Sequence, residues 1–178
     1  NDLSLFSSNG NTIQEEGSGP HITANDIRIF GNLSTSGTNT GTKEIAGSLS
    51  FQNLAEYTVN INGETDFDQL QLTGTPTLTL DNTDLIASIG GGFSPDGEEI
   101  VLIDIAGTNA VVGTFDGLPE GSTFDINGFN FTITYVGGDG NDVVLNAEDV
   151  LSSKSFLLDN LILYPNPARD VINLSNPD

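Results

Sequence analysis

The chain has 178 residues, of which 4 are basic and 25 acidic, so its formal net charge at pH 7 is −21. Its length suits one ordinary domain with a short tail, and its charge excludes the usual nucleic-acid binders and polybasic membrane-surface modules. Cysteine is absent, His21 is the only histidine, and no apolar run reaches the ~20 residues that span a bilayer, which excludes disulfides, His-rich zinc sites and membrane insertion within this sequence.

Apolar and polar residues alternate along most of the chain, which is the period of a half-buried strand. Clusters of Gly, Asn, Asp and Pro separate these stretches, and the pairs Asn62-Gly63 and Asn127-Gly128 are hairpin signals. Many short strands at regular spacing predict an all-β protein. In chain order, strands are predicted over residues 21–30, 44–51, 56–61, 67–72, 77–80, 85–89, 99–105, 110–115, 122–126, 129–135 and 142–146.

Two features favour a parallel β-solenoid over the alternative, a β-sandwich. A glycine followed by an alternating strand recurs at residues 31–34, 47–50 and 74–80, at a spacing close to the roughly 20–45 residues of repeat architectures. Residues 100–105 are apolar at nearly every position, as in a strand covered on both faces. The hairpin signal within residues 124–135 adds a candidate antiparallel C-terminal cap.

The alternating pattern stops at residues 147–160, AEDVLSSKSFLLDN, which contain no glycine and mix charged with apolar residues. A fresh alternating strand follows at residues 171–174. The sequence therefore predicts an all-β module over residues 1–146, a linker over residues 147–160 and a separate C-terminal segment over residues 161–178.

Residues 137–145, GGDGNDVVL, fit the nonapeptide pattern that binds calcium in β-rolls. Asp142 would supply a hard carboxylate oxygen, which calcium prefers, and Asp139 and Asn141 would add further oxygen ligands. The alternative is a glycine-rich turn before the closing strand, because such sites are built from consecutive repeats and this chain has one copy.

Asn62, Glu64, Asp66 and Asp68 form a second acidic cluster, which the pattern predicts as a solvated hairpin or, alternatively, as another calcium loop. The sequence has no nucleophile elbow and no Trp, and aromatic residues make up 7% of it. We therefore predict that this chain is not an enzyme.

The segments IAGSLSF, FDQLQLTGTPTL, FSPDGEEIVLIDI, GTFDGLPEGSTF, FTITY and GGDGNDVVL lie in this order between residues 44 and 145. In order and wording they resemble the right-handed parallel β-helix segments of bacterial adhesins and autotransporter-like surface proteins. The resemblance implies the C-terminal end of a stalk or display scaffold that lies outside the cell or on its outer surface.

Residues 162–174, ILYPNPARDVINL, resemble the opening of the C-terminal sorting domain of type IX secretion substrates in Bacteroidota. The motif consists of Tyr164, Pro165, Asn166 and Pro167. In that family the domain is a small β-sandwich recognised by the export machinery of the outer membrane. The chain stops at Asp178, so it would hold only the start of such a domain. The alternative is a linker turn fixed by the two prolines.

Together these features predict a non-enzymatic structural or adhesive module of a secreted, cell-surface bacterial protein that is exported through its C-terminal sorting signal. Its predicted partners are the type IX export machinery and a surface polysaccharide or another protein, with calcium as the candidate cofactor. The alternative function is the accessory or calcium-dependent carbohydrate-binding end of a secreted polysaccharide-active enzyme.

Overall fold

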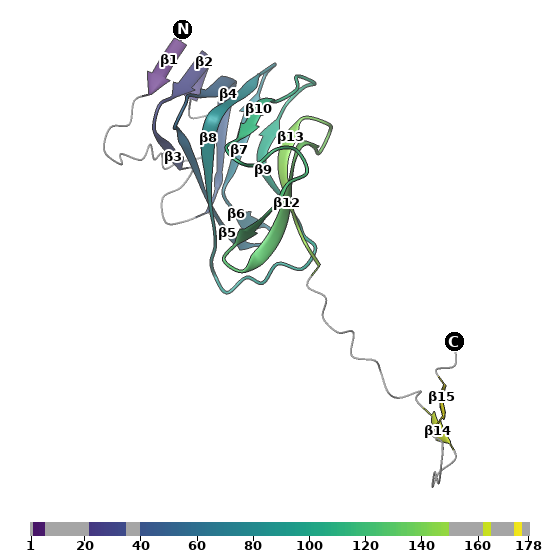
Figure 1. Ribbon diagram of the computed structural model, residues 1–178. Coiled ribbons are helices and arrows are strands. Elements are labelled where there is room, and N and C mark those ends of the chain that lie inside the picture. The colour runs from purple at the N-terminus through teal and green to yellow at the C-terminus, as the bar shows by residue number, and fades with distance from the viewer. Residues whose placement is uncertain (1, 6–21, 35–39, 150–161, 165–172, 176–178) are drawn as a thin grey trace.

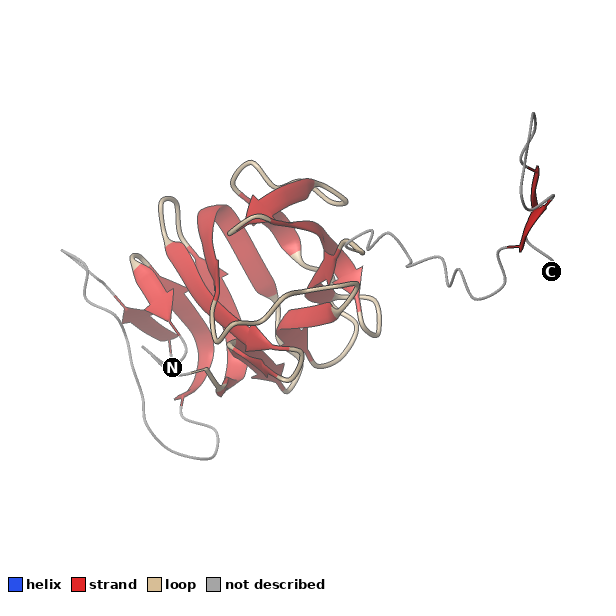
Figure 2. Cartoon of the chain, turned by 90° about the horizontal axis from the view of Figure 1, so that it is seen from below, coloured by secondary structure: helices blue, strands red, loops and turns tan. Residues whose placement is uncertain are grey.

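The computed structural model describes residues 2–5, 22–34, 40–149, 162–164 and 173–175 of the chain (Figure 1). These residues form strands and no helix, which confirms the predicted all-β class. One mixed sheet of 13 strands curls into a half-barrel, and β14 and β15 form a separate two-stranded antiparallel sheet (Figure 2).

The strands take their positions from the alternation of apolar and polar residues. Their bounds are β1 Asp2–Leu5, β2 Ile22–Ile29, β3 Asn32–Ser34, β4 Thr42–Phe51, β5 Glu56–Gly63, β6 Asp66–Phe67, β7 Gln69–Thr73, β8 Leu78–Ile89, β9 Glu99–Ile105, β10 Val112–Phe115, β11 Thr123–Ile126, β12 Phe129–Gly137, β13 Asp142–Ala147, β14 Ile162–Tyr164 and β15 Asn173–Ser175.

The first ten strands, β1 through β10 without the short β6, pair in parallel and form three ladders. In the first ladder, the start of β4 pairs with β7, and β7 pairs with β9. The start of β2 also belongs to the first ladder, where it pairs with the start of β4. In the second ladder, β1, the end of β2, the end of β4, the start of β8 and then β10 lie side by side. In the third ladder, β3 pairs with β5, and β5 pairs with the end of β8.

The chain visits the first, second and third ladders in a repeating cyclic order. Side chains that bond across neighbouring strands are therefore separated by similar stretches of sequence, from 24 residues between Asn32 and Glu56 to 33 residues between Gln71 and Asp104. These intervals fall within the period of repeat proteins, roughly 20–50 residues. The body of the molecule is thus layered, with each passage of the chain lying on the previous one.

Three antiparallel strands follow the parallel body, and we call them the closing group. β13 pairs with β9, β12 pairs with β13, and β11 pairs with β12. The turn between β11 and β12 is formed by Asn127 and Gly128, both with positive φ (52° and 93°), so the hairpin predicted at this pair is confirmed.

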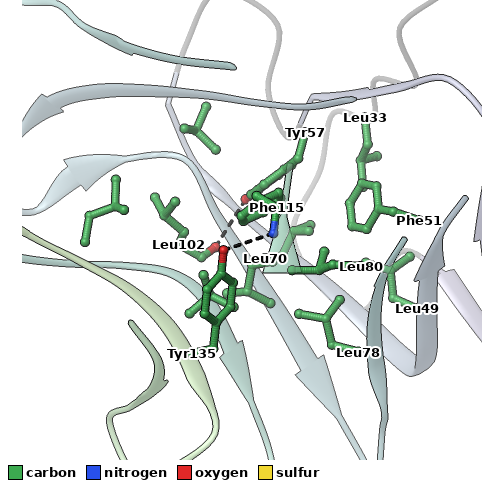
Figure 3. Close-up of a cluster of buried hydrophobic side chains, with 14 of the residues drawn as sticks. Leu33, Leu49, Phe51, Tyr57, Leu70, Leu78, Leu80, Leu102, Phe115 and Tyr135 are labelled. Atoms are coloured by element: carbon green, nitrogen blue, oxygen red, sulfur yellow. Dashed lines mark hydrogen bonds between the residues drawn. The ribbon is translucent and has the colours of Figure 1, made fainter. Parts of the chain in front are cut away.

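The core lies inside the curl and is built from rows of stacked apolar side chains (Figure 3). One side chain in each strand occupies an equivalent place because the pairing is in register. The rows include Ile45, Leu72 and Ile105 in the first ladder and Ile27, Leu49 and Leu78 in the second, each at most 2% exposed.

Aromatic rings form a continuous line through this core. Phe51 contacts Tyr57, Tyr57 stacks on Phe115, and Phe115 contacts Tyr135, with ring centroids 5.8, 6.3 and 6.2 Å apart. These spacings are those of favourable aromatic pairs. The line connects the parallel body, through Phe115 of β10, to Tyr135 of the closing group.

Some predicted element bounds were wrong. The strands predicted over residues 77–80 and 85–89 form one strand, β8, whose first half belongs to the second ladder and whose second half belongs to the third. The strand predicted over residues 67–72 is interrupted at Asp68, because the backbone changes partner there: the Asp68 amide donates to Asn60 of β5, and the Gln69 amide donates to Gly41 beside β4. The turn predicted at Asn62 and Gly63 lies further along, at residues 64–65, because β5 extends to Gly63.

Candidate functional site

The turn predicted to bind calcium connects β12 to β13, at the edge of the closing group. Asp142 is 7% exposed, and its Oδ1 accepts a hydrogen bond from the Ile105 amide at 2.7 Å. Burial raises the pKa of Asp142, and the neighbouring carboxylates of Asp104 and Asp139 raise the pKa further, while the Ile105 amide opposes the shift. The Asp142 carboxylate therefore joins the turn to the end of the first ladder.

Asn141 lies beside it and is 2% exposed. Its Nδ2 donates to the Gly107 carbonyl at 3.3 Å and to the Asn109 carbonyl at 3.0 Å, so the amide holds the loop that follows β9. Its Oδ1 is buried and has no hydrogen-bond partner among the described residues. The nitrogen of the Asn141 side chain thus has a structural role, while its buried oxygen is left without a partner among the described residues.

Asp139, the third predicted ligand, is exposed at the tip of the turn. Within the described part of the chain, no group of three or more His, Cys, Asp or Glu side chains is arranged to hold a metal ion. Calcium binding by Asp139, Asn141 and Asp142 remains a prediction. The glycines of the turn have a local reason, because a Cβ on Gly138 would lie 1.8 Å from Asp142 Oδ2.

The second acidic cluster divides into one buried and several exposed side chains. Asp68 is fully buried, and its carboxylate accepts hydrogen bonds from the Gly41 amide at 3.1 Å and from the Asn60 amide at 2.9 Å. Asp66 accepts a hydrogen bond from the Thr40 hydroxyl, and Glu64 is exposed in the turn. The cluster therefore braces a corner between the third and first ladders.

The closing group contributes a side-chain acceptor to the free edge of each ladder, a feature that the sequence did not indicate. The Ala106 amide donates a hydrogen bond to the Leu72 carbonyl within the first ladder. The Ile105 amide therefore points to the opposite side, where it donates to the Asp142 carboxylate. In the second ladder, Tyr135 Oη accepts from the Phe115 amide at 3.0 Å. In the third ladder, Asn127 Oδ1 accepts from the Ile89 amide at 2.8 Å.

Tyr135 makes the most extensive of these contacts (Figure 3). Its hydroxyl also donates to the Leu118 carbonyl at 2.7 Å, which fixes the loop between β10 and β11. Burial raises the pKa of Tyr135 to about 12, with a further contribution from the Glu120 carboxylate. Glu120 in turn accepts from the Tyr135 amide at 2.6 Å. Tyr135 therefore remains neutral at physiological pH, as its hydrogen bond to the Leu118 carbonyl requires, because the hydroxyl is the donor there.

The predicted sorting motif lies mostly outside the described residues. Tyr164 ends β14, and its backbone pairs with Asn173 of β15 in an antiparallel register. Pro165, Asn166 and Pro167 are outside the described residues, as are residues 150–160 of the predicted linker. The sorting function of this segment remains a prediction.

Comparison of the chain with protein families, with characterised proteins and with solved structures gives no match. Among the described residues, no helix has the length and hydrophobicity needed to cross a membrane. The functional assignment therefore depends on the geometry of the ladders and of the closing group.

Proposed function

We propose that the described body is the C-terminal end of a right-handed parallel β-helix, and that it serves as a non-enzymatic stalk or display scaffold of a secreted bacterial surface protein. The observation that carries this proposal is the cyclic order in which the chain visits its three ladders, each layer lying on the previous one. Stacked layers of this kind make a stiff rod, because each layer is held by its neighbours.

Further support comes from the closing group and from the acidic surface. The antiparallel strands end the parallel stacking on one side, as expected at the end of a rod. A net charge of −21 keeps such a rod soluble and prevents its association with other acidic surfaces. Export would depend on the segment around Tyr164 to Pro167, through recognition by the type IX machinery of the outer membrane.

The test is intact-mass measurement and peptide mapping of the native protein, isolated from the surface and the medium of the producing cells. The proposal predicts a longer chain, with repeated strand patterns before Asn1 and a mature C-terminus near Leu163. A compact catalytic domain before Asn1 would instead favour the accessory end of a polysaccharide-active enzyme. A native protein that begins at Asn1 would contradict the stalk.

A further inference from the structure

The end of β8, from Asp84 to Ile89, has a strand partner on one side only among the described residues. Its inner side pairs with β5 throughout the third ladder. On its outer side, β10 pairs with β8 as far as Thr83, and the chain then leaves this edge, after the Asp116 amide donates to Thr83. The second half of β8 is therefore an edge strand on the described surface.

The direction of the backbone groups along this edge follows from the bonds on the inner side. The amides of Asp84 and Gly90 donate to Ala55 and Ile61 of the β5 side. Because the peptide groups of a strand alternate in direction, those of Leu85, Ala87 and Ile89 point outward. The Ile89 amide donates a hydrogen bond to Asn127 Oδ1. Leu85 and Ala87 thus present two donors and two acceptors along the remaining edge, which is the pattern that an added strand requires.

The other two ladders are closed more completely. β13 pairs with β9 along residues 99–103, and Asp142 continues that closure to the Ile105 amide. In the second ladder, the outward amide of Phe115 donates a hydrogen bond to the Tyr135 hydroxyl. The last strands of the second and third ladders are thus each closed by one side chain, and the end of β8, which pairs with β5 from Asp84 to Ile89, presents the longer edge of the two. An edge of this kind is a template for pairing with another chain.

Apolar side chains border this edge. The inward-facing Leu85 and Ala87 are only partly buried, whereas their neighbours Tyr57 and Val59 in β5 are fully buried. On the outward face, Ile86 is 48% exposed. Leu118 and Phe124 of the adjoining loop and of β11 are also partly buried against the core, and β11 lies against β8. An added strand would cover this apolar surface, which the closing group leaves partly open.

The charge around the edge selects the partner. Asp84 is exposed and pairs in register with Glu56 of β5, which places two like charges on neighbouring strands. Asp116 and Asp125, both exposed, lie in the segments that follow β10 and precede Asn127. The two described basic residues belong to other ladders, where Arg28 pairs with Asp26 and Lys43 is buried.

We propose that the edge of β8 from Asp84 to Ile89 binds an extended, cationic peptide segment of a partner protein by strand addition. The backbone groups of Leu85 and Ala87 would form ladder hydrogen bonds with the peptide backbone, which provide the affinity for the peptide. Alternate apolar side chains of the peptide would cover Leu85, Ala87 and Leu118. Lysines on its other face would lie beside Asp84. The assignment depends on the described contacts alone and does not require the stalk.

The probe is the peptide Ac-Thr-Lys-Val-Lys-Val-Lys-Thr-NH2, titrated into the full chain labelled with ¹⁵N. We expect shifts of the Leu85 and Ala87 amide signals, with slower hydrogen exchange at both. The same peptide with its three central amides N-methylated keeps its charge, but neither edge of the peptide strand can then complete the hydrogen bonds of a ladder. It should bind at least about tenfold more weakly, as should the peptide with Glu in place of Lys.

Two protein variants test the edge from the other side. Ala87→Pro removes an outward amide that β5 does not use, so it should keep the fold and weaken binding of the lysine peptide by about tenfold or more. Its control is Ser88→Pro, which removes a donor on the β5 side and should lower the stability of the protein. Asp84→Asn should weaken binding and reduce its salt dependence.

Several results would overturn the proposal. Equal binding of the N-methylated and unmethylated peptides would mean that charge alone acts. Unchanged binding by Ala87→Pro, or shifts confined to residues outside β8, would place the peptide elsewhere. Protection of the Ala87 amide that rises with protein concentration in the absence of peptide would mean that a second copy of the chain covers the edge.

Discussion

Buried polar atoms in this core differ in whether they have a partner. The Tyr57 hydroxyl donates to the Leu102 carbonyl at 3.2 Å, and the Tyr135 hydroxyl has two partners. Thr83, by contrast, is fully buried in β8, and its Oγ1 has no partner among the described residues. A buried hydroxyl without a hydrogen bond costs folding free energy, whereas a satisfied one stabilises the fold. The two kinds of residue should therefore respond in opposite ways to removal of the hydroxyl.

Replacing Thr83 by Val should stabilise the protein by about 1 kcal/mol, because a methyl group replaces an unpartnered hydroxyl in the same space. The measurement is the free energy of unfolding in urea. Thr83→Ala is the control, because it removes the hydroxyl but leaves a cavity, and it should not stabilise. A loss of stability in Thr83→Val would show that the hydroxyl has a partner in solution.

Replacing Tyr135 by Phe should destabilise the protein by about 1–3 kcal/mol near neutral pH, because the Phe115 amide and the Leu118 carbonyl lose their partner. The folded pKa, about 12, lies above the ordinary value of 10.0, so the folded protein holds this proton more tightly than the unfolded chain does. The stability that Tyr135 contributes is therefore present below pH 10 and decreases as the pH rises toward 12.

The stability difference between the wild type and Tyr135→Phe should accordingly shrink between about pH 10 and about pH 12. Unfolding by urea at each pH measures it, and comparison of the two proteins cancels the titration of the other tyrosines. A constant difference over this range would mean that the Tyr135 hydroxyl titrates normally in the folded protein.

The sequence indicated that Asp142 and Asn141 are special but did not indicate their contacts. Asp142 bonds to Ile105, which is 37 residues away, and Asn141 bonds to Asn109, which is 32 residues away. A motif of nine residues carries no information about such distant partners. The role of Tyr135 was missed for the same reason, since an aromatic residue in an alternating strand predicts only a core position.

At the level of the elements, the period of two predicted most strands, and β9 occupies the predicted residues 99–105. The sequence could not show that one continuous strand, β8, serves two ladders. The corner within β8 includes Asn82, which has a positive φ of 50°, and Asn82 Nδ2 bonds to Asn53 Oδ1 at 3.0 Å. The short strand β14 was not predicted, because three residues contain too little alternation to be recognised.

Gly113 in β10 lies where a neighbouring backbone leaves no room for a side chain. Its φ is 82°, and a Cβ would lie 2.1 Å from the Leu80 carbonyl oxygen of the neighbouring strand. Gly113→Ala should therefore destabilise the protein by more than the ~1 kcal/mol expected for a strained backbone alone. Gly117→Ala is the control, because Gly117 has a φ of 68° but open space at its Cβ position. Thermal unfolding compares the two, and equal losses would contradict the close approach.

The whole molecule is governed by its negative charge. With 25 acidic and 4 basic residues, repulsion between carboxylates opposes the compact state. Stacking in register increases this effect, because it places Glu56 beside Asp84 on adjacent strands. The molecule tolerates the repulsion because the apolar rows and aromatic line beneath it are continuous.

The melting temperature should therefore rise as sodium chloride is increased from about 10 mM to about 300 mM, because the Debye length falls from about 30 Å to less than 8 Å. Magnesium and calcium at equal concentration distinguish screening from a specific site. A larger effect of calcium that is lost in Asn141→Ala would support the predicted calcium turn. A melting temperature unchanged by salt and by chelator would contradict both.

The cyclic order of the ladders also has an evolutionary consequence. Ile45, Leu72 and Ile105 occupy equivalent places, so duplication of one complete passage of the chain would add a layer whose inner side chains meet the same kind of neighbour. An insertion of one residue within a strand would instead turn the apolar residues beyond it outward. Descendants of this gene should thus differ in length by whole passages, and the closing strands should be inherited unchanged at the end of each.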